Sequence, residues 1–332
     1  MKTPSPKDRR RVGFNRSQSE YGQLLTPSLW AAAVLLSFTL VLVNDAAVAQ
    51  GIDFCQLTAH DALSACRTGA MSDSQLAVAK CDNIADTAQR KACQQQASAD
   101  LKDAKQKCSD QNTSRLAVCD RLGRATYDPV IDPANFVAVI NNPYFPLTPG
   151  TTFIYKSETE IDKFSVTHNT KVILGVTCVE VRDTVTTLAG ELTEDTLDWF
   201  AQDKQGNVLY FGENAKQLEG GLVVGLKGSW IAGIDGAKPG IIVEAHPAVG
   251  DFYRQEFALG TAEDHGEVLS LSESVTVPLP PHSFHNCLKT EDGSSLEPDV
   301  VENKFYCPGI GDVLEIDLTS GERLELTQIT TE

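Results

Sequence analysis

The residues that interrupt helices are nearly absent from the early part of this 332-residue sequence. Residues 52–122 contain no proline and one glycine, Gly69. Proline and glycine are the least favourable residues in a helix interior, so their absence removes the usual helix stops. Alanine, glutamine, lysine and aspartate dominate the stretch, which therefore predicts long helices.

Enzyme signatures are missing as well. The sequence has no Gly-x-Ser-x-Gly nucleophile elbow, no His-Glu-x-x-His zinc motif, no phosphate-binding P-loop and no dinucleotide-binding glycine fingerprint. These absences exclude the hydrolases, metalloproteases and nucleotide-binding enzymes that such motifs define. A non-enzymatic function is therefore the leading hypothesis, although the question of catalysis stays open.

Long apolar runs are missing except at residues 30–43. A basic stretch precedes this run, and Ala47-Val48-Ala49 supplies the small residues that signal peptidase requires. The run is shorter than the ~20 residues of a membrane-spanning helix. We predict an export signal over residues 1–49, with Gln50 as the new N-terminus and no membrane span after cleavage. The alternative is an uncleaved membrane anchor.

Charge is distributed unevenly along the chain. Residues 50–124 carry ten Lys and Arg against nine Asp and Glu, whereas residues 125–332 carry twelve against 33. The acidic part repels nucleic acid and anionic membranes, so we expect no nucleic-acid partner. The excess of acid indicates either solubility alone or a site for a cation.

Six cysteines in the helical stretch are spaced symmetrically, at intervals of 11, 15, 12, 15 and 11 residues. An antiparallel helical hairpin cross-linked at three levels requires such spacing, and paired cysteines indicate an oxidising compartment. We predict a disulfide-stapled helical hairpin over residues 50–123, with its turn near residues 83–87. Its arms are expected to pack as a coiled coil and to serve as a stalk or as a docking arm for a protein partner.

Folding the chain at that turn gives one set of disulfides among the 15 connectivities that six cysteines allow. The nested set is Cys55–Cys119, Cys66–Cys108 and Cys81–Cys93. The alternative turns near residues 69–74 and needs a second reversal near residues 109–114. It pairs Cys66 with Cys81, Cys55 with Cys93 and Cys108 with Cys119.

The composition changes near residue 124. Prolines between 124 and 141 indicate an irregular linker. In residues 142–332 polar and apolar side chains alternate, many residues are β-branched, and turn residues are frequent. This pattern predicts an antiparallel β-barrel or a strongly curved β-sandwich. The fold class is therefore α+β in two modules. The expected strands are 152–158, 165–174, 176–187, 192–202, 208–211, 222–230, 241–245, 252–259, 267–271, 275–279, 284–290, 300–307, 313–317 and 323–329.

Three cysteines lie in the β module. Cys287 and Cys307 flank a turn at residues 292–299, which favours a cross-strand disulfide. Cys178 is then unpaired. We interpret it as a buried, inert thiol in preference to a reactive one.

Several motifs of the β module occur together in a recognisable order. They are Asn-Pro-Tyr-Phe-Pro-Leu at 142–147, Pro-Gly-Thr at 149–151, Gly-Val-Thr-Cys at 175–178, Glu-Asp-Thr-Leu-Asp-Trp-Phe-Ala-Gln-Asp at 194–203, Gly-Asn-Val-Leu-Tyr-Phe-Gly-Glu at 206–213 and Pro-Gly-Ile-Gly at 308–311. Over nearly all of 142–330 the chain resembles an uncharacterised family of secreted bacterial proteins. No activity is established for that family, so the resemblance supports the domain boundary and implies no mechanism.

One acidic group is a candidate metal site. Glu256, Glu263, Asp264, His265 and Glu267 offer carboxylate oxygens and one imidazole nitrogen, which are donors that a divalent cation accepts. The alternative is a solvated acidic turn.

A second group is a candidate ligand site: Glu194, Asp198, Trp199, Tyr210 and Glu213, on two strands joined by residues 203–207. Glu194 and Asp198 share one strand face, because side chains alternate along a strand. Carboxyl groups enclosed beside aromatic rings have raised pKa values, which mark functional sites.

The sequence thus favours a secreted or periplasmic binding or surface protein whose acidic β module holds a small ligand or a divalent cation. One alternative is an extracytoplasmic hydrolase that uses paired carboxylates. The other is a purely structural envelope protein, which predicts a filled β core without a cavity.

Overall fold

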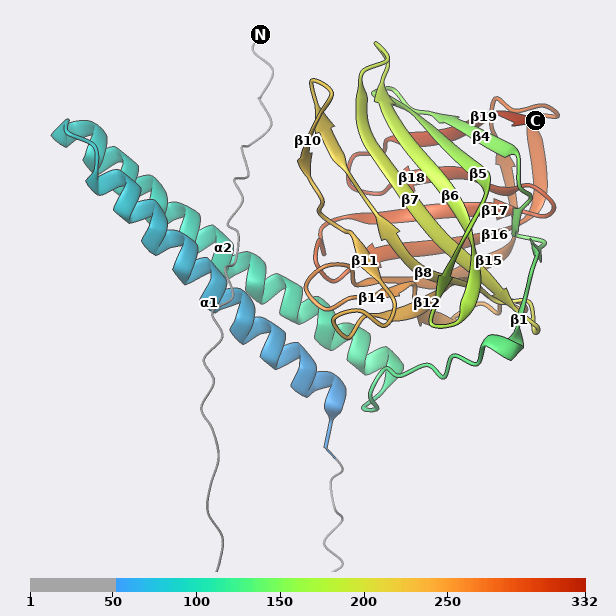
Figure 1. Cartoon of the computed structure of the whole chain (residues 1–332), viewed down its shortest axis with the longest axis horizontal. Coiled ribbons are helices and arrows are strands. Elements are labelled where there is room, and N and C mark those ends of the chain that lie inside the picture. Colours follow the sequence, from blue (N-terminus) through green and yellow to red (C-terminus); the bar gives the residue numbers. More distant parts are fainter. Residues whose placement is uncertain (1–51) are drawn as a thin grey trace, which may run out of the picture. The chain divides into compact units, whose positions relative to one another are not determined.

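The computed structural model describes residues 52–332, so the predicted export signal lies outside the described residues. Two long helices come first, α1 (Phe54–Asp82) and α2 (Thr87–Leu122). The carboxylates of Asp53 and Asp86 accept hydrogen bonds from the backbone N–H groups of Gln56 and Gln89, which caps both helix starts. The helices run antiparallel about a short turn, as predicted (Figure 1).

Three disulfides cross-link the two helices in the nested order. Cys55–Cys119, Cys66–Cys108 and Cys81–Cys93 have Cα–Cα distances of 5.6, 5.8 and 5.5 Å. These distances are normal for unstrained cystines. The palindromic pairing is confirmed, and the alternative turn near residues 69–74 is wrong.

The helices do not pack through the apolar seam of a coiled coil. In α1 the buried residues are Ala59 and Cys81, and neither helix repeats buried large apolar residues every three to four positions. Small alanines and cystines occupy the contact between the arms. The expectation of coiled-coil packing was wrong, because disulfides hold these helices together where a coiled coil uses a seam of large apolar side chains such as leucine.

The β module is built from one large sheet of 17 strands and one two-stranded hairpin. The small hairpin comprises β2 (Ile140–Asn142) and β3 (Phe145–Leu147). The large sheet comprises β1 (Phe136–Val137), β4 (Thr151–Lys156), β5 (Glu160–Ile173), β6 (Val176–Thr187), β7 (Leu192–Asp203), β8 (Val208–Asn214), β9 (Gln217–Glu219), β10 (Leu222–Gly225), β11 (Trp230–Ile231), β12 (Lys238–Val243), β13 (Phe252–Arg254), β14 (Glu256–Phe257), β15 (Asp264–Thr276), β16 (Ser283–Ser294), β17 (Val301–Cys307), β18 (Gly311–Asp317) and β19 (Arg323–Thr331).

Antiparallel pairing carries this sheet almost completely around a barrel. Strands β4 to β8 are sequential neighbours, and β15 to β19 are as well. The last strand, β19, pairs with β4. At the other seam β12 pairs with both β8 and β14, and β13, one residue before β14, pairs with β15. The prediction of an antiparallel barrel after a helical hairpin is confirmed.

Strand boundaries differ from expectation mainly at bulges. The expected strands 267–271 and 275–279 belong mostly to one long strand, β15, whose register against β16 shifts three times. The expected strand 222–230 is instead two short pieces, β10 and β11, separated by a turn. A bulge preserves pairing across residues that interrupt the apolar alternation, so the pattern alone divides one strand into two.

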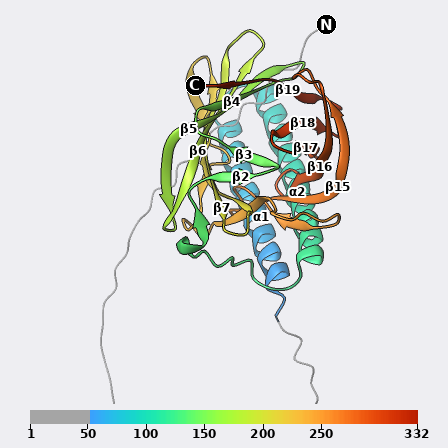
Figure 2. The same ribbon diagram turned by 90° about the vertical axis from the view of Figure 1, so that its right-hand side faces the viewer.

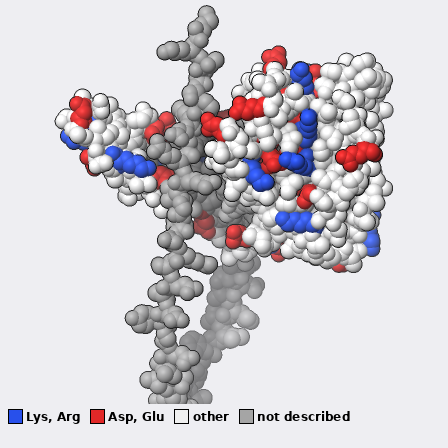
Figure 3. Space-filling view, turned by 45° about the horizontal axis from the view of Figure 1, so that its top comes forward, with Lys and Arg blue, Asp and Glu red and all other residues white. Residues whose placement is uncertain are grey.

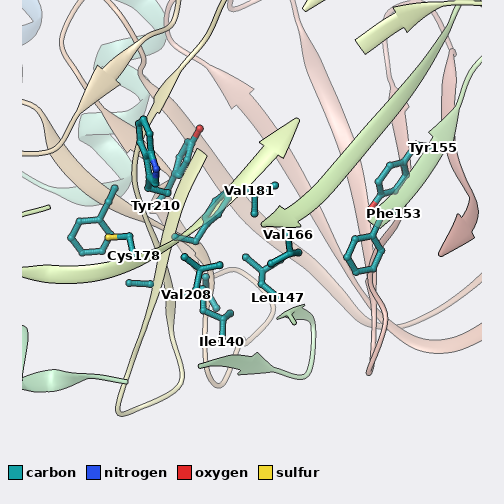
Figure 4. Close-up of a cluster of buried hydrophobic side chains, with 14 of the residues drawn as sticks. Ile140, Leu147, Phe153, Tyr155, Val166, Cys178, Val181, Val208 and Tyr210 are labelled. Carbon is teal, nitrogen blue, oxygen red and sulfur yellow. The ribbon is translucent and has the colours of Figure 1, made fainter. Parts of the chain in front are cut away.

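The β2–β3 hairpin lies inside one end of the barrel (Figure 2). Ile140 and Leu147 are each 2% exposed and lie beside Val208 and Val166 of the wall (Figure 4). The Gln202 side-chain oxygen accepts hydrogen bonds of 2.8 Å from two consecutive backbone N–H groups of β2. This plug therefore closes one end of the barrel with satisfied backbone groups.

The base of the helical hairpin is packed against the barrel. Arg115 of α2 forms a buried ion pair with Glu263, and the Gln111 side chain donates a hydrogen bond to the Leu296 carbonyl. The end that carries the turn between the helices extends away from the sheet (Figure 1). The hairpin is thus anchored along the C-terminal half of α2, not joined only through the linker.

The remaining cysteines behave as predicted. Cys287 and Cys307 form a disulfide between β16 and β17, and Cys178 is a buried free thiol. Within residues 52–332 neither helix combines the length and the apolar character that crossing a membrane requires.

Candidate ligand-binding lumen

Strand alternation gives the barrel an acidic inside. On β7 the side chains of Asp198 and Phe200 line an internal cavity, whereas Asp195 bonds Arg182 on the outside at 2.8 Å. The face carrying Glu194, Asp198 and Gln202 points inward, because successive side chains of a strand point to opposite faces. The predicted shared face of these residues is therefore the interior.

The cavity has a volume of about 230 Å³. Aromatic rings and carboxyl groups together form its wall, and Lys304 is the one cation among the lining side chains of the described chain. The aromatic residues are Phe145, Phe153, Tyr155, Phe164, Phe200, Tyr210 and Tyr306. The eight carboxyl residues are Asp162, Asp183, Asp198, Glu256, Asp264, Asp292, Asp312 and Glu315.

Phe145 of the plug forms the floor of this cavity. Its ring contacts Phe164, Phe200 and Tyr306 edge-on, with centroids 6.2, 5.4 and 6.3 Å away. Phe200 is also stacked on Tyr210 at 4.7 Å. Edge-to-face and stacked contacts of this kind are favourable beyond the apolar area they bury. The aromatic floor is therefore a fixed surface.

A second hollow of about 380 Å³ adjoins the first. The two share several lining residues, among them Glu256, Asp264 and Asp292. Glu194 and Glu213 line the second hollow. We call the two together the lumen.

On the face shown in Figure 3, lysine and arginine are interspersed with aspartate and glutamate. Twelve of the 33 acidic residues of 125–332 line the lumen. Ionised carboxylates there would interact more strongly than on the surface, because the local dielectric is lower.

Burial raises the pKa of several lumen carboxyls, among them Asp198 and Glu213. The pKa of Asp198 is well above its usual range, chiefly because of burial and then because of the charge of Asp183; the Tyr210 hydroxyl, which donates to Asp198 at 2.5 Å, acts in the other direction. Burial, together with Glu194 and Asp264, raises the pKa of Glu213 to about 7. The lumen therefore holds protons on groups that are ionised in water.

Two pairs of lumen carboxyls lie in direct contact. Asp162 and Asp183 are hydrogen-bonded to each other, and burial followed by the Asp183 charge raises the pKa of Asp162. Asp312 and Glu315 form a similar pair at the other side of the β4–β19 seam. Two carboxyls in contact cannot both ionise, so each pair shares a proton.

Lys304 is the counter-charge within the first cavity. Its Nζ lies 3.3 Å from a Glu315 oxygen and 3.8 Å from a Glu302 oxygen. Burial lowers the pKa of Lys304, but Glu315 and Glu302 outweigh burial and raise it well above the usual value. The cavity thus places one ammonium group among eight carboxyls, which outnumber it when they ionise.

Asp292 is a buried hydrogen-bond acceptor of the lumen. Its side chain is 7% exposed, and one oxygen accepts a 2.8 Å bond from the Gln255 amide. Burial raises the pKa of Asp292, while Lys304 and hydrogen bonds from Gln255 and Thr290 act in the other direction.

Four of the five residues predicted to bind a ligand lie at the lumen. Asp198 and Tyr210 line the first cavity, and Glu194 and Glu213 line the adjoining hollow. Trp199 was placed there wrongly.

Trp199 lies on the outer face of the barrel wall. Lys171 covers its ring at 3.6 Å, and its Nε1 donates to Glu180 at 3.2 Å. Alternation explains the error, because Asp198 and its neighbour cannot both point inward.

The predicted metal site is not assembled. Within residues 52–332 no group of three or more His, Cys, Asp or Glu side chains is arranged to hold a metal ion. Glu263 and Glu267 are instead paired with Arg115 and Arg121, each at 2.7 Å. The remaining three are Glu256 and Asp264, which line the lumen, and His265, which packs on Phe252.

Alternation also divides the metal candidates. Asp264 points into the barrel and His265 points out, so consecutive residues cannot converge on one ion. Burial and the nearby Arg254 lower the pKa of His265 to about 4. The prediction of a five-residue metal site was wrong.

Sequence reasoning missed half of the lumen. Asp162, Asp183, Asp292, Lys304, Asp312 and Glu315 come from five strands that are distant in sequence. The available signal was a carboxylate alternating with an aromatic residue, as in Asp162 and Phe164. That signal points to a lumen only once the sheet is known to close.

Comparisons with known proteins find weak structural similarities but assign no family to the chain. No family profile matches the sequence, and no curated protein matches it. A Bacteroides fragilis protein described as exported, with a YmcC-like fold, aligns with TM-score 0.35 and 16% identity over 57% of this chain and 99% of its own. A Parabacteroides distasonis protein described as a lipoprotein aligns with TM-score 0.33 and 12% identity over the same shares. Both scores are below 0.5, so the fold assignment here rests on strand pairing alone.

Proposed function

We propose that the protein is an exported binding protein whose barrel lumen holds a small organic cation. The observation that carries the proposal is a cavity in which eight carboxyl groups and seven aromatic rings surround one lysine. Carboxylates supply charge and hydrogen-bond acceptors for an ammonium group, and aromatic faces attract cations. The cavity of about 230 Å³ exceeds the roughly 150 Å³ that accommodates benzene.

An organic cation fits this lumen better than a bare metal ion. The carboxyls are distributed around an aromatic wall, and no set of three described His, Cys, Asp or Glu side chains converges as metal ligands do. The buried Asp292 carboxyl already accepts an N–H bond from Gln255 and suits such a donor. The protonated carboxyls would release protons as the cation enters, so affinity should increase with pH.

Other parts of the chain support the export component of the proposal. Four disulfides persist only in an oxidising compartment, which agrees with the expected export signal and with the resemblance to secreted bacterial proteins. The distal hairpin, beyond the contacts of Arg115, is free to serve as the arm that docks a partner.

Calorimetric titration at pH 8 tests the proposal. The probes are tetramethylammonium, 1,4-diaminobutane and, separately, Ca²⁺ and Zn²⁺. We expect saturable binding of at least one ammonium probe, weakened at least tenfold by Asp198→Asn. The matched control is Asp195→Asn, which removes a carboxylate from the outer face of the same strand and should leave binding unchanged.

Three results would contradict the proposal. The first is the absence of ammonium binding below millimolar concentration. The second is binding of the metal ions in its place, which would restore the divalent cation as the ligand. An Asp195→Asn effect equal to that of Asp198→Asn would show that the lumen is not the site.

A further inference from the structure

A small cavity separates the base of the helical hairpin from the barrel. Its volume is about 90 Å³. Apolar side chains of both modules line it, including Phe54 and Leu122 from the hairpin and Leu259 from the barrel. Two arginines, Arg115 of α2 and Arg254 of β13, also line it. It is distinct from the lumen, which these arginines do not line.

Arg254 is buried without a polar partner. The residue is 7% exposed. Within residues 52–332 its side chain has neither a hydrogen bond nor an ion pair. Its guanidinium lies 4.7 Å from the centroid of Phe257 and 5.5 Å from that of Tyr127. The aromatic rings fix the orientation of the group, and its Nε donor is buried without a hydrogen-bond partner in the described chain.

Arg115 adds a second unsatisfied donor. Its Nε and Nη2 each donate to Glu263 at 2.7 Å, while Nη1 is enclosed and has no partner in the described chain. Glu263 also accepts the backbone N–H of Gly260. One carboxylate thus neutralises one of two buried guanidinium groups, and one positive charge is left over.

We propose that this cavity binds a small monocarboxylate between the hairpin and the barrel. A guanidinium is planar and matches a carboxylate with two parallel hydrogen bonds. One negative charge restores neutrality, whereas a dianion would leave an excess. The apolar residues Phe54, Leu122 and Leu259 suit a short alkyl tail, which chloride and sulfate lack.

The geometry gives this site a structural consequence. Arg115 belongs to the hairpin and Arg254 to the barrel, so an anion held by both bridges the two modules. Binding of the anion to the folded protein alone stabilises the docked arrangement by mass action.

Calorimetry and thermal unfolding with sodium propionate test this proposal. Propionamide is the neutral control of the same shape, and sodium chloride and sodium sulfate at matched ionic strength are the ionic controls. We expect saturable propionate binding that raises the Tm, with at least tenfold weaker effects from the three controls. Arg254→Gln should weaken propionate binding at least tenfold.

The matched control variant is Arg121→Gln. Arg121 also lies over an aromatic ring, Phe252 at 4.6 Å, but it is exposed and already paired with Glu267. We expect propionate binding to change less than twofold in this variant. Asp198→Asn should also leave it unchanged, which separates this site from the lumen.

Several outcomes would overturn the inference: no saturable propionate binding by the unaltered protein, equal binding of propionamide, or equal effects of chloride. The comparison of propionate with propionamide needs no variant, so it decides the question even if Arg254→Gln does not fold. Equal propionate binding by folded Arg254→Gln would also overturn it.

Discussion

Arg115 and Glu263 form a two-bond ion pair, with both N–O distances at 2.7 Å, in which the carboxylate side chain is 1% exposed and the arginine side chain 6%. The pair joins the C-terminal half of α2 to the residue just before β15. A pair this well enclosed is costly to form but far more costly to break, because the surviving partner is left charged and buried. It is therefore the point at which the stability of the hairpin and that of the barrel are linked.

Replacing Arg115 with methionine should destabilise the protein by about 3 kcal/mol, the lower end of the range for breaking a buried pair. The lower end applies because Gly260 still donates to Glu263 and because Arg254 lies nearby. Urea unfolding measures the change.

Arg121→Met is the matched control for this prediction, since its pair with Glu267 has the same 2.7 Å distance but side chains that are 43% and 26% exposed. We expect Arg121→Met to lower the free energy of unfolding by less than about 1 kcal/mol. Arg115→Met combined with Glu263→Gln should recover part of the loss. Equal effects of the two single variants would refute the assignment of Arg115 as the linking residue.

Stability should fall as pH rises from about 4.5 to about 7. The pKa of Glu213 is raised from 4.5 to about 7 in the folded protein, mainly by burial. Between these values the unfolded chain releases the proton that the folded protein keeps, so ionisation favours unfolding. Stability is therefore full below 4.5 and is lost as pH passes through 7. Urea midpoints measured from pH 4.5 to pH 8 check the slope.

Glu213→Gln should flatten this dependence, because it removes the titrating group. His265 acts in the opposite sense, because its pKa is lowered from 6.5 to about 4 in the folded protein. Its contribution to stability is therefore lost as the pH falls below 6.5. The variant must therefore be compared with the parent at each pH. An unchanged slope in Glu213→Gln would mean that other lumen carboxyls dominate.

Reduction should melt the outer hairpin first. The arms between Cys66 and Cys108 extend past the docked base and bury little apolar surface, and each disulfide contributes about 2–4 kcal/mol. With dithiothreitol, helical circular dichroism should fall in part, while the near-ultraviolet signal of the buried Trp199 and Trp230 persists. Hydrogen exchange should show protection retained near Arg115. Simultaneous loss of both signals would mean that the modules unfold as one cooperative unit.

Cys178 should not react in the folded protein. It is 0% exposed, and burial raises the pKa of its thiol to about 12, so the reactive thiolate is scarce. Ellman's reagent at pH 8 should detect no thiol in the native protein and one per chain in guanidinium chloride, because the other eight cysteines are paired. Rapid native labelling would place Cys178 nearer the surface than the fold allows.

The features that sequence reasoning found are those with a short-range signature. The hairpin and its cross-links follow from the cysteine intervals, and the turn between Asp82 and Thr87 is where those intervals place it. Asp198, Tyr210 and Glu213 were recognised because they lie on adjacent strands with alternating side chains.

The features that were missed depend on closure of the sheet. Asp162 and Asp312 line one cavity only because β19 pairs with β4. No local sequence pattern predicts that pairing. Arg254 carries no sequence signal at all, because its isolation results from the way the hairpin covers it. The metal prediction failed for two reasons. Alternation separates Asp264 from its neighbours, and arginines of α2 pair with Glu263 and Glu267, which the local pattern does not reveal.

The seam between β4 and β19 sets an order of events when the chain folds from its N-terminus. The hairpin is complete once Cys119 is present, so its three cross-links can form on an N-terminal fragment of the chain. The barrel has no such early stage, because Thr151 lies opposite Thr331 and the wall cannot be joined before the last strand arrives. A chain that emerges N-terminus first therefore carries a finished arm ahead of an open sheet, and the acidic interior comes into existence in the final step of folding.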